Sequence, residues 1–295
     1  MLAGFSAYLI WGMFPLFWPL LEPAGAAEIL AHRIIWSALC MTVVVIAARR
    51  VARLKALARD RRSLLILAGA ASAISVNWGT YIWAVNAGHV VEASLGYFIN
   101  PLVSVAFGVL LLGERLRRAQ WVAVGIAVIA VIVLAVDHGR PPWIALTLAV
   151  SFATYGLAKK QADAGAFESL TLETALLTPF ALAYVGFLAS TGDLEFGAHG
   201  LGHMVLLMTA GLLTAVPLVL FGAAATRMSL VSLGLLQYLA PILQFAIGVL
   251  VYSEAMPPVR WIGFALVWAA LILFTFETIN HRRKQLLLAT TSSAV

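Results

Sequence analysis

The feature that most constrains the fold is an apolar stretch with a proline near its middle. Residues 93–114 read ASLGYFINPLVSVAFGVLLLGE and are long and apolar enough to cross a membrane as a helix. Pro101 removes one backbone hydrogen bond and frees the carbonyl of Tyr97. Lipid offers no partner for a freed carbonyl. We therefore expect a broken helix that faces the interior of the protein.

The same stretch occurs a second time, as VSLGLLQYLAPILQFAIGVLVYSE over residues 231–254. When Pro241 is aligned with Pro101, an offset of 140 residues, the match continues through several pairs: Gly108 and Gly248, Val109 and Val249, Leu110 and Leu250, Glu114 and Glu254, and Trp121 and Trp261. Repeated halves with proline-interrupted helices in corresponding positions indicate the binding site of a transporter. Pro101 and Pro241 are the predicted helix breaks.

The composition excludes a soluble domain. The chain is 62% hydrophobic and 11% charged, whereas soluble domains carry about 25% charged residues. The net charge of +6 does not indicate nucleic-acid binding, because the basic residues lie in short loops between apolar spans. The single cysteine, Cys40, excludes an intrachain disulfide, and no metal-ligand spacing appears, so we expect no metal and no cofactor.

The apolar spans divide the chain into two halves. We count ten spans, at about residues 3–21, 27–48, 63–86, 92–112, 119–136, 142–158, 168–189, 202–222, 229–251 and 259–279. The first is interpreted as a retained helix and not as a signal peptide, because no basic residue precedes it. Residues 1–136 and 142–279 then form repeats of five helices each, and residues 280–295 a disordered cytoplasmic tail.

Lysine and arginine positions predict the orientation. Sixteen of these residues fall in alternate loops, beginning with loop 49–62, and only Arg140 and Arg260 fall in loops on the opposite side. Because cytoplasmic loops are enriched in Lys and Arg, both termini are predicted to be cytoplasmic. An odd number of spans per repeat inverts the second copy. The predicted fold is an all-α polytopic membrane protein with ten transmembrane helices as two inverted five-helix repeats.

These features resemble the EamA domain of the drug/metabolite transporter superfamily. Several strings are similar to its RarD subfamily: AYLIWG (7–12), EILAHR (28–33), NW (77–78), IWAVN (82–86), EASLGYFINPL (92–102), AAATR (223–227) and QY (237–238). One departure is the absence of basic residues before the first span. The resemblance covers essentially the whole chain and implies a permease of ten helices in a bacterial-type inner membrane. It supplies a fold and a class of protein, not a substrate.

Charged residues within the spans are the first candidates for substrate contact. Arg33 lies inside the second span, where an arginine costs about 2.5–3.5 kcal/mol and needs a partner or an aqueous cavity. Glu28 and His32 are four residues apart on one helical face beside it. Glu173 is the counterpart of Arg33 in the repeat; it could pair with Arg33 directly or carry a proton. The alternatives are a snorkelling Arg33 and a purely structural ion pair.

Polar and aromatic residues supply a second set. Tyr97 and Asn100 share one face of the first proline-containing helix, and Gln237, Tyr238 and Gln244 belong to the second. On the third span, Asn77 and Tyr81 form one row, and Trp78 and Asn86 lie on another. Each could contact an amphiphilic solute; the alternative is ordinary helix packing. Glu92 begins its span, where it could act as a gate or simply suit the helix N-terminus.

The sequence thus predicts a secondary-active or facilitative transporter, an exporter of a small organic metabolite or amphiphilic drug, working by alternating access. Its partners would be the solute, membrane lipids and possible protons. A gate or coupling role is assigned to Glu28, Glu92 and Glu173. The rival interpretation is an intramembrane enzyme or a non-transporting adaptor. An enzyme would need a nucleophile–base or metal cluster, and the intramembrane Glu and His residues lack such a motif.

Overall fold

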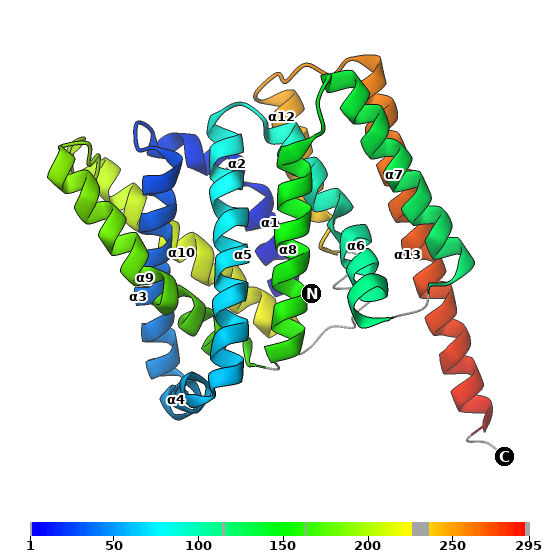
Figure 1. Cartoon of the computed structure of the whole chain (residues 1–295), viewed down its shortest axis with the longest axis horizontal. Helices are drawn as coiled ribbons and strands as arrows, with labels where there is room; N and C mark the ends of the chain where they lie inside the picture. Colours follow the sequence, from blue (N-terminus) through cyan, green and yellow to red (C-terminus); the bar gives the residue numbers. More distant parts are fainter. Residues whose placement is uncertain (1, 114–115, 163, 226–235, 293–295) are drawn as a thin grey trace.

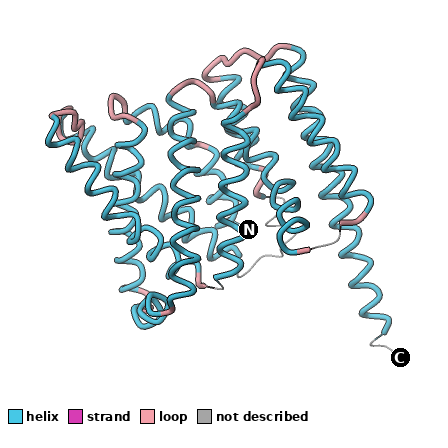
Figure 2. The backbone as a smooth tube through the Cα atoms, in the orientation of Figure 1, coloured by secondary structure: helices cyan, strands magenta, loops and turns pink. Residues whose placement is uncertain are grey.

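The computed structural model describes residues 2–113, 116–162, 164–225 and 236–292, and these fold into helices with no strand among them (Figures 1 and 2). The first half contains α1 (Leu2–Gly12), α2 (Phe14–Phe17), η1 (Trp18–Leu21), α3 (Ala26–Ala47), α4 (Val51–Arg59), α5 (Arg61–Asn86), α6 (Val90–Leu112) and α7 (Arg118–His138). The second half contains α8 (Trp143–Ala162), α9 (Ala166–Thr191), α10 (Gly200–Ala225), α12 (Leu239–Leu250) and α13 (Pro258–Ser292).

Seven of these helices are long and apolar enough to cross a membrane. An eighth candidate is the pair formed by α1 and the segment 14–21, which is bent by 47°. The ten predicted spans all overlap helices, although part of span 229–251 lies outside the described residues. The all-helical, multi-pass class is therefore confirmed, while α8 and the short α12 fall outside the set of candidate spans. The count of ten remains a prediction.

The two halves are interleaved and do not form separate bundles. The most extensive helix contacts all join the halves: α5 and α6 with α8, α3 with α9 and α10, α1 with α10 and α12, α6 with α12, and α7 with α13. The last pair lies side by side at one end of the molecule (Figure 1). Helices α1, α3, α5, α6 and α7 of the first half thus each pack against helices of the second half.

Glycines permit the closest of these approaches. A Cβ atom added at Gly211 on α10 would lie 2.4 Å from the backbone carbonyl carbon of Trp36 on α3. One added at Gly96 on α6 would lie 2.8 Å from the carbonyl oxygen of Ala145 on α8. Small residues of this kind let membrane helices pack backbone to backbone.

The predicted helix breaks differ between the two copies. Helix α6 runs without interruption through Pro101, so the break expected there is absent. In the second copy the helix begins at Leu239, and Pro241 lies in its first turn. A proline costs little in a first turn, because the N–H that it lacks would have no helical partner there. Within α6, protein surroundings tolerate the lost hydrogen bond.

The C-terminal tail is a second correction. Residues 280–292 continue helix α13 instead of forming the predicted disordered tail. Adding residues to an existing helix is far easier than starting one, and this segment is rich in strong helix formers such as Leu, Lys and Gln. Three residues used in the repeat and charge arguments lie outside the described residues: Glu114, Arg115 and Arg227.

Candidate functional site

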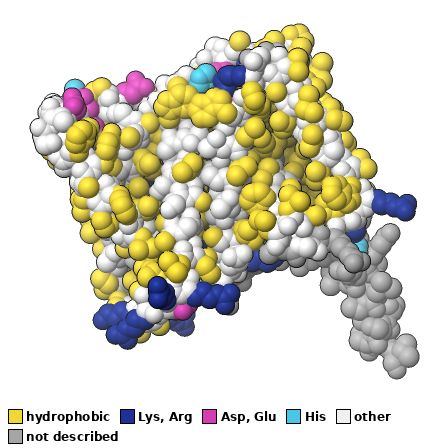
Figure 3. Space-filling model, viewed as in Figure 1, with side chains coloured by type: hydrophobic (Ala, Val, Ile, Leu, Met, Phe, Trp, Pro, Cys, Tyr) yellow, Lys and Arg dark blue, Asp and Glu magenta, His cyan; other side chains and the backbone are white. Residues whose placement is uncertain are grey.

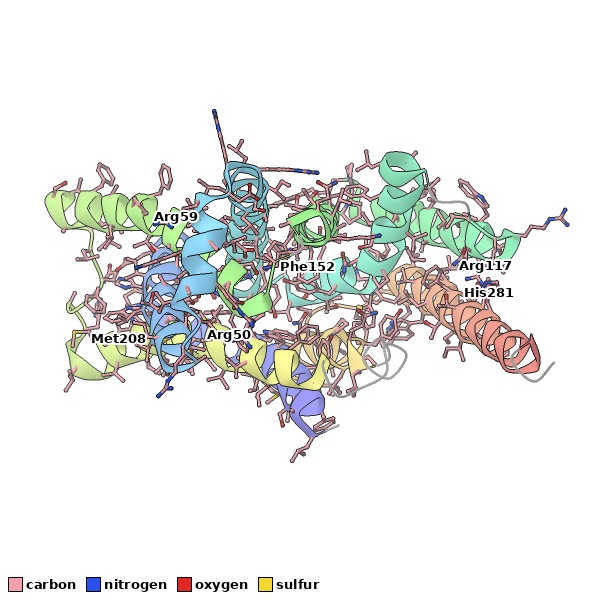
Figure 4. All side chains as sticks on the ribbon, turned by 90° about the horizontal axis from the view of Figure 1, so that it is seen from below. Arg50, Arg59, Arg117, Phe152, Met208 and His281 are labelled. Atoms are coloured by element: carbon pink, nitrogen blue, oxygen red, sulfur yellow. The ribbon has the colours of Figure 1, made fainter. Side chains whose placement is uncertain are left out.

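A cavity of about 400 Å³ lies between the two halves and is lined from both. The first half contributes residues of α1, α2, α3, α5 and α6, and the second half contributes residues of α8, α9, α10 and α12. Figure 4 shows one lining residue, Phe152, near the middle of the molecule. The lining includes ten of the residues singled out from the sequence: Arg33, Asn77, Trp78, Tyr81, Tyr97, Asn100, Pro101, Gln237, Pro241 and Gln244.

Arg33 is buried in the wall of this cavity, with 3% of its surface exposed. Its Nε donates a hydrogen bond to Oγ1 of Thr214 on α10, at 2.9 Å. Its guanidinium carbon lies 4.1 Å from the ring centroid of Trp78 and 5.1 Å from that of Trp18, within the range of cation–π attraction. This geometry excludes a snorkelling side chain. No carboxylate of the described residues lies within ion-pair distance of Arg33.

Glu173 has a different partner from the one that the repeat suggested. One of its carboxylate oxygens accepts a hydrogen bond from Nζ of Lys159 at 2.8 Å, and the other accepts one from the Tyr155 hydroxyl at 3.1 Å. Lys159 also donates to Ser169. Lys159 and Tyr155 line the cavity, while Glu173 lies behind them with 1% of its surface exposed. The direct Arg33–Glu173 pair is therefore absent, and the counter-ion of Glu173 is Lys159.

Asn77 joins three helices at the cavity wall. Its Nδ2 donates to the carbonyl of Leu148, at 2.9 Å, and to the hydroxyl of Ser151, at 3.1 Å. Its Oδ1 accepts a hydrogen bond from the Tyr97 hydroxyl at 3.0 Å. Because every hydrogen-bonding group of this amide has a partner on α6 or α8, the network fixes the position of α5 against both helices.

Three other polar atoms at the cavity are enclosed but have no partner among the described residues. They are the hydroxyl of Tyr81, Oδ1 of Asn100 and Oε1 of Gln244. Gln244 does use its amide nitrogen, which donates to the carbonyl of Trp11 at 3.1 Å. Buried polar atoms normally have partners, so these three are unsatisfied groups of the cavity-lining residues.

His32 and Glu28 lie away from the cavity. The His32 ring stacks on Phe196, with ring centroids 4.5 Å apart, and accepts a hydrogen bond from Trp36 at 3.3 Å. Adjacent residues on a helix point about 100° apart, which is why His32 does not share the surroundings of Arg33. Glu28 accepts hydrogen bonds from the backbone N–H groups of Glu195, at 3.1 Å, and Phe196, at 3.0 Å.

Glu92, Tyr238 and Asn86 are also absent from the cavity lining. Glu92 accepts from Arg140 at 3.2 Å and from the backbone N–H of Ile144, in the first turn of α8, at 3.1 Å. Tyr238 lines a separate apolar groove between α6, α12 and α13. Asn86 is the last residue of α5. Of the predicted site residues, these three and the pair of Glu28 and His32 thus lie outside the cavity lining.

Several lining residues were missed by the sequence argument. They include the aromatic residues Tyr8, Trp11, Phe14, Phe152 and Phe221, and the polar residue Thr214. Tyr8 and Trp11 lie three residues apart, hence on one helical face, and their rings are 5.3 Å apart in an edge-to-face arrangement. The three-residue spacing of Tyr8 and Trp11 was the feature of the sequence that could have identified this pair. Among the described residues, no group of three or more His, Cys, Asp or Glu could hold a metal ion.

The sequence is similar to known membrane proteins over nearly its whole length. Residues 1–136 match the EamA-like transporter family. Protein RarD of Streptomyces exfoliatus is 60% identical over 284 residues, covering 96% of this chain and 90% of that protein. The uncharacterized transporter YojE of Bacillus subtilis (strain 168) is 45% identical over 282 residues, covering 94% and 93%. One solved crystal structure, 20% identical, superposes with a TM-score of 0.59 over 93% of this chain and 96% of that one, which shows a shared fold.

Proposed function

The chain belongs to the RarD group of the EamA-like transporter family, and from this premise we propose that it moves a small organic solute across the membrane through its central cavity. The proposed mechanism is alternating access, in which the cavity opens to one side of the membrane and then to the other. The solute is a small metabolite or an amphiphilic drug, and the direction is export.

One observation carries this proposal: the cavity lies between interleaved halves, and helices of both halves line it. A site enclosed by helices of both halves changes its access when the helices on its two sides rock against one another. A non-transporting adaptor would have no use for an internal cavity of this kind. An enzyme would need a nucleophile–base or metal cluster there, and the family relationship favours a transporter.

The division into two inverted repeats, residues 1–136 and 142–279, is supported by a pair of equivalent carboxylates. Glu28 and Glu168, 140 residues apart, each begin a long helix, α3 and α9. Glu28 binds the backbone at Glu195 and Phe196, just after α9 ends. Glu168 pairs with Arg50, just after α3 ends, at 3.3 Å. Each carboxylate thus binds the segment that follows the helix on which the other carboxylate lies. We propose that both of these contacts break during the movement that changes access to the cavity.

The proposed orientation of the chain in the membrane rests on the distribution of Lys and Arg residues. Figure 3 shows Lys and Arg side chains gathered at the lower edge of the molecule, over α4, and Glu and Asp side chains at the upper edge. By the enrichment of Lys and Arg on the cytoplasmic side, the lower face is cytoplasmic, as are both termini. The membrane is the inner membrane of a bacterial-type cell.

Coupling is assigned to Glu173. A carboxylate buried beside a cavity lysine can exchange a proton during the transport cycle. Facilitated exchange without a proton is the second candidate mechanism. Transport measured with and without a pH gradient separates the two, because only the coupled mechanism concentrates solute at the expense of the gradient.

Two experiments test transport itself. The first measures uptake and efflux of a metabolite panel in vesicles that contain the wild type or Arg33→Ala, with Arg59→Gln, an exposed change on α4, as the matched control. We expect a solute that the wild type and the control move and Arg33→Ala does not. The second places single cysteines at positions 97 and 237 in a Cys40→Ser background and labels them from each side. Labelling from one side only, in every condition, would contradict alternating access.

A further inference from the structure

The charged residues that line the cavity indicate a class of substrate. We infer that the solute is a small organic anion, with its negatively charged group on Arg33 and an aromatic or other apolar body against the surrounding rings. This inference rests on the proposed function, since it assigns a substrate class to the same cavity.

The charge balance of the cavity wall is positive. Arg33 and Lys159 are the two charged residues that line it. Lys159 is neutralised by Glu173 at 2.8 Å, whereas Arg33 has no carboxylate partner in the described part of the chain. A buried arginine without a counter-ion is costly in a membrane protein. An anionic solute would supply the missing charge.

The guanidinium is held in a way that leaves its binding face available. Its Nε donates to Thr214, and the described residues offer no hydrogen-bond partner to its two terminal nitrogens. The planar group lies over Trp78, at 4.1 Å from the ring centroid, with Phe14 at 5.5 Å. A guanidinium fixed at Nε and stacked on a ring presents a planar set of donors that suits a carboxylate.

The rest of the cavity suits an apolar body with a polar group. Aromatic side chains of α1, α5, α6, α8 and α10 line it, namely Tyr8, Trp11, Trp78, Tyr97, Phe152 and Phe221. Asn100 and Gln244, which also line it, each carry a buried acceptor oxygen without a partner among the described residues. Its volume of about 400 Å³ lies at the small end of ligand sites. A compact aromatic anion with one further hydrogen-bonding group fits all of these features.

The test compares three probes of nearly equal shape and different charge: 3-phenylpropanoate, 3-phenylpropanamide and 3-phenylpropylammonium. Binding to the full chain in nanodiscs of zwitterionic lipid is measured by calorimetry at pH 7, with empty nanodiscs as the blank. Zwitterionic lipid keeps anionic headgroups from competing for the arginine. The variants are Arg33→Gln and Arg33→Lys, with Arg59→Gln as the control on exposed α4.

We expect the propanoate to bind the wild type and Arg59→Gln at least about tenfold more tightly than the amide, because charge-assisted hydrogen bonds are worth that much. Arg33→Gln should abolish this preference for the propanoate over the amide. Arg33→Lys should retain part of the preference for the propanoate, because the positive charge remains. This variant therefore separates an effect of lost charge from an effect of lost folding.

Equal binding of the three probes, preference for the ammonium, or no binding by any of them would overturn the inference. Its failure is distinguishable from that of the proposed function. Vesicle transport of neutral or cationic solutes through the cavity would support transport and refute the anion preference. Anion binding without transport of any solute would support the anion preference and refute transport.

Discussion

Glu173 and Lys159 form an ion pair, with 2.8 Å between Oε1 and Nζ, at the edge of the central cavity. Both residues belong to the second half, on α9 and α8. By the repeat, Glu173 corresponds to Arg33, yet its positive partner comes from its own half. This arrangement satisfies the buried carboxylate locally and leaves Arg33 as the uncompensated charge of the cavity.

Breaking this pair from one side should be more damaging than removing both charges. Lys159→Met leaves Glu173, 1% exposed, without its counter-ion, and we expect a loss of about 3–5 kcal/mol of stability. The double variant Lys159→Met/Glu173→Gln should recover a large part of that loss. The measurement is the midpoint of thermal unfolding in detergent. Lys55→Met, on the exposed surface of α4, is the control; additive effects of the two changes would show that the pair is not coupled.

The contact between α3 and α10 predicts opposite effects for two glycine substitutions. Gly211→Ala would place a Cβ atom 2.4 Å from the backbone of Trp36, and such overpacking costs about 1–3 kcal/mol. Gly186→Ala, inside α9, meets no atom within 4 Å and should be neutral or stabilising by up to about 1 kcal/mol, because alanine favours the helix. Thermal unfolding of both variants checks this. Equal behaviour of the two would argue against the close α3–α10 approach.

The helical class and the cavity wall were predictable for the same physical reason. Spans of about 20 apolar residues can only be helices in lipid, and polar residues within them must face protein. That rule placed Arg33, Asn77 and Gln244 correctly in the interior. It could not separate residues at the cavity from residues at packed interfaces, because both environments are buried. Glu28 and His32 belong to the second kind.

Two aromatic residues of the wall, Phe152 and Phe221, were not predictable in this way. Lipid is as apolar as protein, so Phe152 and Phe221 carry no signal of facing inwards. The partner of Glu173 was likewise hidden, because nothing in the sequence indicates that Lys159 on α8 lies within hydrogen-bond distance of Glu173 on α9. The repeat gave equivalent positions, but equivalent positions with opposite charges need not touch. Three-dimensional packing decides which ones do.

The hydrogen bond between Tyr97 and Asn77 should be measurable as a coupling energy. Tyr97→Phe removes the donor at 3.0 Å, and Asn77→Leu removes the acceptor together with the bonds to Leu148 and Ser151. A double-mutant cycle on unfolding free energies should give about 0.6–1.7 kcal/mol of coupling, the range found for hydrogen bonds between membrane helices. Ser72→Ala, at an exposed position of α5, is the control. Zero coupling would mean that the hydroxyl and the amide act independently.

Glu254 predicts a pH dependence of stability. It lies in the loop between α12 and α13, and it accepts hydrogen bonds from the backbone N–H groups of Val90, at 2.6 Å, and Val91, at 3.0 Å, at the start of α6. Burial raises the pKa of its carboxyl above the usual value of 4.5, even though these N–H groups act in the opposite direction. The folded protein therefore holds this proton more tightly than the unfolded chain does.

The sign of the effect follows from linkage. The contribution of the raised pKa is fully present below about pH 4.5 and is lost as the pH rises through the pKa of the folded state. The wild type should therefore lose stability over that interval relative to Glu254→Gln, which keeps an acceptor oxygen but cannot ionise. The difference is obtained from the unfolding midpoints of both proteins, measured from about pH 4, near the ordinary carboxyl pKa, to neutral pH. Glu22→Gln, an exposed loop position, is the control. A difference that grows in favour of the wild type with rising pH would show that the carboxylate is stabilised, not penalised, by its site.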